Sequence, residues 1–506
     1  MTSPTAGVRL GEASGRWVIL AAVLGSGMAM LDATVVNVAL PALGHDLGAG
    51  LDGLQWTLNG YTLTLASFIL LGGSLGDRFG RRRVFVIGTV WFAAASLLCG
   101  AAPTIELLVA ARALQGVGGA LLTPGSLAMI AGLFRGEERG RAIGLWSGFG
   151  GLAGAVGPFV GGWLIGSVGW RWIFLVNLPL AVAVVLVAQR HVPETADPDA
   201  SKSLDGGGAA LGAIGLGGLT YALVRAGEDG LAPAVIASGA IGIAALLGFV
   251  LFERRTRHPM LPLGLFASRQ FAAANAVTFL VYGALGGIFF LFVVQLQVVG
   301  GFSPVLAGAS LLPITAMMLL LSGTAGALAE RIGPRLPMAA GPALSACGVA
   351  LMLRIGARPS FLADVLPAVT VFGLGLAISV APLTATVLGA ADARFAGIAS
   401  GVNNAVARAA GLLAVAVLPL AAGLHGDAYR RPDAFAGGFR LAALICCALL
   451  ASAGLLAAIA IRNRATGGVA AAPEATSASG GPSRLHCPVA GPALHLPPET
   501  PARAGS

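Results

Sequence analysis

The chain has 506 residues, of which 56% are hydrophobic and only 10% charged, and its formal net charge is +9. Soluble globular domains carry roughly 25% charged residues, so this composition excludes an ordinary soluble enzyme and indicates a protein dissolved in the bilayer. Positively charged loops on one side of the membrane account for most of this net charge, so we expect no nucleic-acid partner.

Fourteen apolar segments follow one another along the chain, each long enough to cross a hydrocarbon core of roughly 30 Å as a helix. We predict membrane-spanning helices at residues 17–40, 54–75, 84–102, 105–131, 142–166, 172–189, 208–225, 233–252, 271–298, 305–328, 337–355, 364–388, 396–422 and 437–461.

Two stretches of the sequence return after the same interval of 253 residues. Residues 73–83 are echoed by residues 326–335, and the pattern of residues 141–148 returns at residues 394–401. Such repeats are typical of transporters built from two related halves. We therefore predict an all-α integral membrane protein with two pseudo-symmetric six-helix bundles plus two inserted central helices. The predicted divisions are a leader at 1–16, a first bundle at 17–190, a linker with two extra helices at 191–257, a second bundle at 258–461 and a disordered tail at 462–506.

Positive charge is distributed unequally between the two sets of loops. Twenty Lys and Arg residues fall on the side of the N terminus, against seven on the opposite side. Because cytoplasmic loops retain positive charge, both termini are predicted to lie in the cytoplasm. Thirty arginines against one lysine fit a GC-rich bacterial genome, so the expected location is a bacterial cytoplasmic membrane.

Three ionisable residues lie deep inside predicted spans, at Asp32, Arg112 and Arg408. Buried ionisable groups in membranes are costly and are functional candidates by default. Asp32 and Arg112 both lie roughly 12–14 Å below the outer boundary, so their side chains can meet. We interpret them as a proton-coupling pair; the alternative is a structural ion pair that only joins two helices. The repeat does not reproduce the pair, because Leu285 and Val365 stand at the equivalent positions.

The fifth predicted span carries small residues at helical spacing, namely Ser147, Gly150, Gly154, Gly157 and Gly161, with Pro158 inside the same face. This stripe predicts a close helix contact, and ordinary membrane packing is an equal alternative. Polar residues that could line a substrate cavity are Asn37, Gln115, Tyr282, Gln295, Asn403, Asn404 and Arg408. For each of them a hydrogen bond between helices is at least as plausible.

No nucleotide-driven machinery is evident in the sequence. The only lysine, Lys202, is not part of a phosphate-binding loop, and no metal-ligand spacing is present. We therefore expect neither an enzyme nor a cofactor, and uphill transport would have to use an ion gradient.

Five stretches in order resemble the major facilitator superfamily, and within it the branch of fourteen-span drug:proton antiporters. They are residues 31–41, 73–83, 112–119, 150–162 and 170–179. The resemblance implies the major facilitator fold, alternating access, a proton-transfer role for Arg112, and a fifth helix that seals against leak. It also implies a cytoplasmic latch, the set Gly73, Asp77, Arg78, Gly80, Arg81 and Arg82. Glu330 and Pro334 depart from the pattern in the second half, so a second latch is not expected.

Together these features predict proton-coupled export of lipophilic or cationic drugs or antibiotics, by a protein that works as a monomer. The expected partners are an amphipathic small molecule, protons and the lipid bilayer. Two alternatives stay open: a symporter or facilitator that imports a small polar solute, and a membrane sensor or scaffold that transports nothing.

Overall fold

The structure is a computed structural model that describes residues 8–196, 205–256, 259, 261–391 and 396–463. The described residues contain helices and no strand. The first half consists of α1 (Ala13–Asp46), α2 (Leu51–Phe79), α3 (Arg81–Ala101), α4 (Ile105–Leu133), α5 (Gly136–Ser167), α6 (Trp172–Leu175) and α7 (Asn177–His191). Two further helices follow, α8 (Gly206–Asp229) and α9 (Pro233–Arg255).

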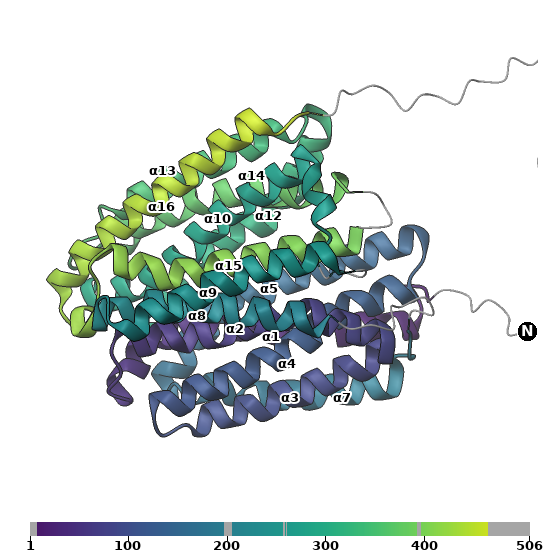
Figure 1. Cartoon of the computed structure of the whole chain (residues 1–506), viewed down its shortest axis with the longest axis horizontal. Coiled ribbons are helices and arrows are strands. Elements are labelled where there is room, and N and C mark those ends of the chain that lie inside the picture. The colour runs from purple at the N-terminus through teal and green to yellow at the C-terminus, as the bar shows by residue number, and fades with distance from the viewer. Residues whose placement is uncertain (1–7, 197–204, 257–258, 260, 392–395, 464–506) are drawn as a thin grey trace, which may run out of the picture. The chain divides into compact units, whose positions relative to one another are not determined.

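The second half repeats the pattern of long helices with short interruptions. Its elements are η1 (Leu263–Ala267), α10 (Arg269–Val294), η2 (Gln295–Val299), α11 (Pro304–Ala309), α12 (Leu312–Ile332), α13 (Arg335–Met352), η3 (Phe361–Val365), α14 (Leu366–Gly389), α15 (Ala396–Ala421), η5 (Gly426–Arg430) and α16 (Pro432–Ala460). Helices α1–α4 and α7 gather in the lower part of Figure 1, and α10, α12–α14 and α16 in the upper part.

Thirteen helices in the described part of the chain are long and apolar enough to cross a membrane. The fourteenth predicted span corresponds to α5, whose apolar portion, Leu152–Ser167, is shorter. Each predicted span therefore coincides with a helix, and the all-α membrane architecture is confirmed. One compact unit runs to Asn463, so the predicted domain boundaries stay predictions. The predicted tail lies outside the described residues from position 464 onward.

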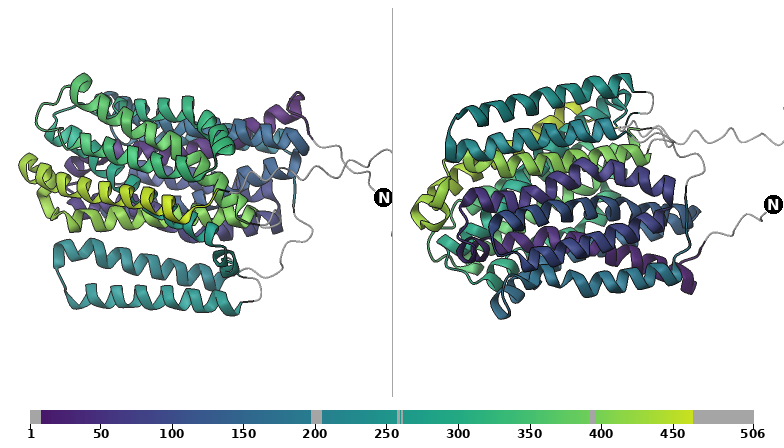
Figure 2. Two further views of the ribbon diagram at one scale, coloured as in Figure 1. Left: turned by 90° about the horizontal axis from the view of Figure 1, so that it is seen from above. Right: turned by 60° about the horizontal axis from the view of Figure 1, so that its bottom comes forward.

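Helices α8 and α9 form a hairpin at the edge of the molecule, where Figure 2 shows them side by side and apart from most other helices. Gly218 and Gly242 allow the two backbones to approach, because a Cβ atom on Gly218 would lie 3.1 Å from the Cα of Gly242. Arg225 of α8 pairs with Asp52 of α2 at 3.5 Å, and α8 also packs on α15. The hairpin therefore contacts both halves.

Hydrogen bonds between the halves gather at the end of the molecule where the α1–α2 loop lies. Gln55 of α2 donates to the carbonyl of Val415 at 2.7 Å, and Gln297 of η2 donates to the carbonyl of Val38 at 3.0 Å. Arg430 donates to the carbonyl of Gly44 at 2.9 Å. The two halves are thus joined at this end, which we call the closed end.

Candidate functional site

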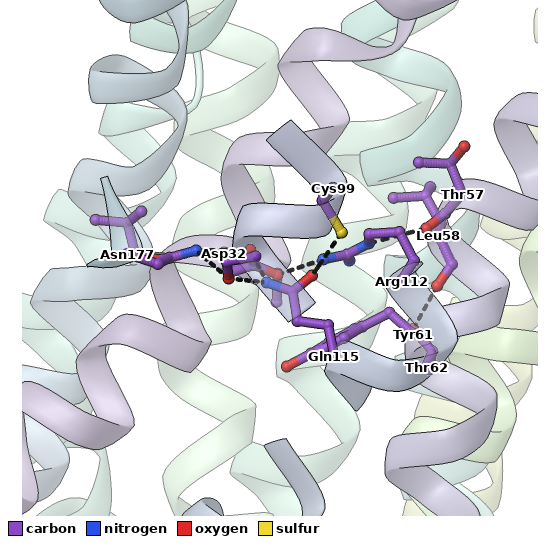
Figure 3. A network of polar contacts seen from close by, with 12 residues as sticks. Asp32, Thr57, Leu58, Tyr61, Thr62, Cys99, Arg112, Gln115 and Asn177 are labelled. Atoms are coloured by element: carbon purple, nitrogen blue, oxygen red, sulfur yellow. Dashed lines mark hydrogen bonds and ion pairs between the residues drawn. The ribbon is translucent and has the colours of Figure 1, made fainter. Parts of the chain in front are cut away.

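Asp32 of α1 and Arg112 of α4 form an ion pair in the interior of the first half. The Nη1 atom of Arg112 lies 2.5 Å from Oδ2 of Asp32, and neither side chain is more than 1% exposed. The sequence placed the two at similar depth, and the structure brings them into contact (Figure 3). Their role in proton coupling stays a prediction.

Two amides complete the surroundings of the Asp32 carboxylate. Gln115 and Asn177 donate to its Oδ1 atom at 2.8 and 3.1 Å. Both amides also donate to the hydroxyl of Ser96, at 2.7 and 3.3 Å. Gln115 was predicted to line the substrate cavity; instead it is completely buried in this network, because it lies one turn from Arg112 on the same face of α4.

The guanidinium of Arg112 is held on its other sides by α2 and two aromatic rings. Its Nε donates to the carbonyl of Thr57 at 3.1 Å, and Nη1 also donates to Oε1 of Gln115 at 2.5 Å. The Cζ atom lies 4.3 Å from the ring centre of Tyr61 and 5.8 Å from that of Phe174. These contacts orient the cation toward Asp32 and add cation–π attraction.

This arrangement ties the charge of Asp32 to the packing of α1 against α4. The ionised carboxylate receives hydrogen bonds from three side chains, which stabilise its charge in a site that water does not reach. A proton on Asp32 would cancel that charge and leave Arg112 buried without a counter-charge. Loss of one partner of a buried pair typically costs about 3–5 kcal/mol, so a protonated Asp32 favours a rearrangement of α1 against α4.

The predicted latch lies at the opposite end of the first half. Arg81 donates to Asp77 at 2.8 Å, and the latch itself stays a prediction. Glu194, which follows α7, was not predicted to take part. The carboxylate of Glu194 accepts hydrogen bonds from the backbone N–H groups of Arg82 and Arg83, at 2.9 and 3.1 Å, and thereby caps the N terminus of α3.

Gly80 makes this contact possible. It has a φ of 107°, a conformation that favours glycine, and a Cβ there would lie 2.7 Å from the Glu194 carboxyl carbon. The segment after α7 therefore ties the predicted latch to the end of the first half.

The small residues of α5 form two separate contacts. A Cβ on Gly157 would meet the hydroxyl of Thr34, and one on Gly161 would meet Val35, so these glycines allow α5 to lie against α1. Gly154 does not belong to this seam, contrary to prediction, because a Cβ built there meets nothing within 4 Å. At this level the neighbouring Ala153 faces α1 instead, 3.3 Å from a Cβ built on Gly27. Gly150 and Ser147 lie outside the residues whose surroundings the structure describes.

On another face, α5 touches α11 of the second half at backbone level. A Cβ on Gly308 of α11 would meet the carbonyl oxygen of Pro158, and one on Gly162 would meet that of Pro304. Pro158 thus belongs to the contact between halves at the closed end, where no side chain separates the two helices.

Three of the predicted cavity residues form hydrogen bonds within the helical bundle. Gln295 is buried and donates to the carbonyl of Ile355 at 3.0 Å, which agrees with the alternative of a hydrogen bond within the helical bundle, and its place in the cavity wall stays a prediction. Asn403 accepts a hydrogen bond from Thr278 at 2.8 Å, and Asn37 in the first half donates to its own helix at Ala33. Their amides are therefore engaged in helix packing.

Arg408 differs from the other predicted cavity residues because its side chain is charged. Its Nε is buried and has no hydrogen-bond partner among the described residues. Its guanidinium interacts electrostatically with Tyr282 of α10 and with Tyr61 of α2. Asn404, one turn earlier, is exposed and donates to the carbonyl of Ser400 in its own helix.

Comparison with known proteins identifies the class to which this fold and site belong. Residues 22–415 match the Major Facilitator Superfamily, and the chain is a member of that family of membrane transporters. The chain is 36% identical over 392 residues to the multidrug resistance protein Stp of Mycobacterium tuberculosis (strain CDC 1551 / Oshkosh), covering 76% of this chain and 72% of that protein.

Two other relatives are named for single antibiotics. The methylenomycin A resistance protein of Bacillus subtilis (strain 168) is 35% identical, with 80% of this chain and 87% of that protein covered. The probable actinorhodin transporter of Streptomyces coelicolor (strain ATCC BAA-471 / A3(2) / M145) is 38% identical, with 77% and 70% covered. The close relatives are thus multidrug and antibiotic resistance or export proteins.

Solved structures agree on the fold. A bacterial homolog of the human lysosomal transporter Spinster, in an inward-facing and unoccupied conformation, superimposes with a TM-score of 0.63 at 16% identity, over 89% of this chain and 97% of that chain. A D-xylose-proton symporter gives a TM-score of 0.63 at 15% identity, over 88% and 98%. At such identities the likeness concerns the major facilitator fold alone.

Proposed function

We propose that this protein is a proton-coupled antiporter that exports amphipathic antibiotics or drugs across the bacterial cytoplasmic membrane. The observation that carries the proposal is the completely buried Asp32 with a single cationic partner, Arg112. Relatives named for multidrug resistance and for antibiotic transport support the class of cargo. Both termini lie in the cytoplasm, and the monomer is the working unit.

In the proposed cycle, Asp32 takes a proton from outside and releases it inside. With the closed end shut, the carboxylate is ionised and bound to Arg112, and the cargo binds between the halves from the cytoplasm. Opening of the closed end separates α5 from α11 and gives the exterior access to the cavity. Protonation of Asp32 then weakens its contact with Arg112 and favours return of the empty transporter.

The direction of transport and its energy source can be tested in cells loaded with lipophilic fluorescent dyes of different charge. Cells that express the protein should retain less dye than control cells, because the proton gradient drives export of the dye. An uncoupler should raise the dye in expressing cells to the control level. The measurement is cell fluorescence before and after addition of the uncoupler.

The two alternative functions give different results in the same experiment. An importing symporter or facilitator would make expressing cells hold more dye than control cells before the uncoupler is added. A sensor or scaffold would leave the two populations equal throughout. Either outcome across the whole dye panel contradicts the proposed export.

A further inference from the structure

Arg408 is a cation inside a membrane-spanning helix for which the described residues supply no counter-charge. It lies near the middle of α15, and no carboxylate of the described chain lies within ion-pair distance of it. Its Nε is buried without a hydrogen-bond partner. Arg112, by contrast, is neutralised by Asp32 and also donates to Thr57 and Gln115. The residue as a whole is half-buried. A cation inside a span that lacks a counter-charge is costly, which indicates that an external group completes the site.

The surroundings of Arg408 lie between the two halves. Tyr282 comes from α10 of the second half and Tyr61 from α2 of the first, and both interact electrostatically with the guanidinium. Asn404 is exposed and lies one turn away on the same face of α15, so this face is accessible beside Arg408.

Tyr61 also links this place to the Asp32–Arg112 pair. Its ring lies under the Arg112 guanidinium at 4.3 Å, and it interacts electrostatically with Asp32, Arg112 and Arg408. An anion at Arg408 would therefore act electrostatically on Tyr61, the residue that packs on Arg112. Figure 3 shows Tyr61 beside Arg112 in this network.

We infer that Arg408 is the recognition residue for an acidic group on the cargo, so that the substrates are lipophilic organic anions such as carboxylates or phenolates. The guanidinium pairs with the acid, Tyr61 and Tyr282 flank it, and the apolar part of the cargo lies along the helices. This inference rests on the proposed export function and narrows it, because a cationic cargo would meet a like charge at Arg408. The membrane potential, negative inside, also favours export of an anion in exchange for an entering proton.

The inference can be tested with three fluorescent probes that differ only in the charged group: 9-anthracenecarboxylate, its methyl ester, and 9-(aminomethyl)anthracene. Binding to the purified full-length protein in lipid nanodiscs is measured by fluorescence anisotropy. The wild type should bind the carboxylate at least about tenfold more tightly than the ester or the amine, since a charge-assisted pair supplies that much discrimination. Arg408→Gln should bring the three affinities to within about threefold, chiefly by weakening carboxylate binding.

A matched control is Arg440→Gln, which removes an exposed arginine of α16 in the same half and should keep the preference for the carboxylate. Thermal unfolding of each variant verifies that it is folded, and Arg408→Lys should retain part of the preference because it keeps the charge. Three results would overturn the inference: equal or tighter binding of the amine by the wild type, a preference that survives in Arg408→Gln, or no carboxylate binding at millimolar concentration.

The same probes separate this inference from the proposed function. Carboxylate preference in binding, without proton-driven transport of any probe, would contradict export and leave the recognition site standing. Proton-driven transport of the amine, with no binding of the carboxylate, would support export and contradict the role of Arg408.

Discussion

Replacement of Arg112 by alanine should abolish transport and lower the free energy of unfolding by about 3–5 kcal/mol, the usual penalty when one partner of a buried pair is removed. The physical reason is that Asp32 is completely buried and would lose the one cationic partner it has among the described residues, while Gln115 and Asn177 supply neutral donors. Proton-driven efflux in vesicles and chemical unfolding in detergent measure the two effects.

The double variant Asp32→Asn, Arg112→Gln separates stability from function. It removes both charges, so most of the lost stability should return, because neutral residues of similar volume can replace a buried pair. Transport should remain absent, since the network then holds no carboxylate that could bind and release the proton. Restored efflux in the double variant, or full efflux in Arg112→Ala, would mean that the pair only joins two helices.

Gly308→Ala should stop transport in a protein that remains folded. The added methyl group would meet the backbone carbonyl of Pro158 across the two halves, and backbone atoms cannot turn aside as a flexible side chain can. The closed end would then be held apart, and the cycle would stall or leak protons. Efflux and proton leak in vesicles, together with thermal unfolding, measure this outcome.

Gly154→Ala provides the matched control, because the same methyl group on α5 meets nothing within 4 Å. Its efflux should equal that of the wild type. If both alanine variants transport equally well, close approach of α5 to α11 is not needed for transport.

The sequence predicts the buried pair of Asp32 and Arg112 because depth in a membrane helix can be counted. Asp32 and Arg112 lie at matching distances from their helix ends, and a rise of 1.5 Å per residue puts them at one level. The same counting cannot show what surrounds them. Asn177 contacts Asp32 across 145 positions of the chain, and its only sequence signal is its place in the motif at residues 170–179.

Sequence spacing was less reliable for the contacts between helices. Gly154 and Gly157 share a face of α5, but only Gly157 lies against α1, and at the level of Gly154 the neighbouring Ala153 makes the contact, 3.3 Å from a Cβ built on Gly27. Gln295 is polar within an apolar segment, which does not tell a cavity residue from one that satisfies a neighbouring carbonyl. Glu194 reaches the start of α3 from 112 positions away, a contact that local patterns cannot reveal.

The most direct measurement of the central claim, that Asp32 carries the coupled proton, compares wild type and Asp32→Asn in everted vesicles with an acidic interior. Addition of a transported compound should drive proton release from wild-type vesicles, recorded with a pH-sensitive dye, because each cargo molecule exchanges for protons. Asp32→Asn should insert normally but release none, since an amide cannot give up a proton. Proton release by Asp32→Asn equal to that of the wild type would contradict the account.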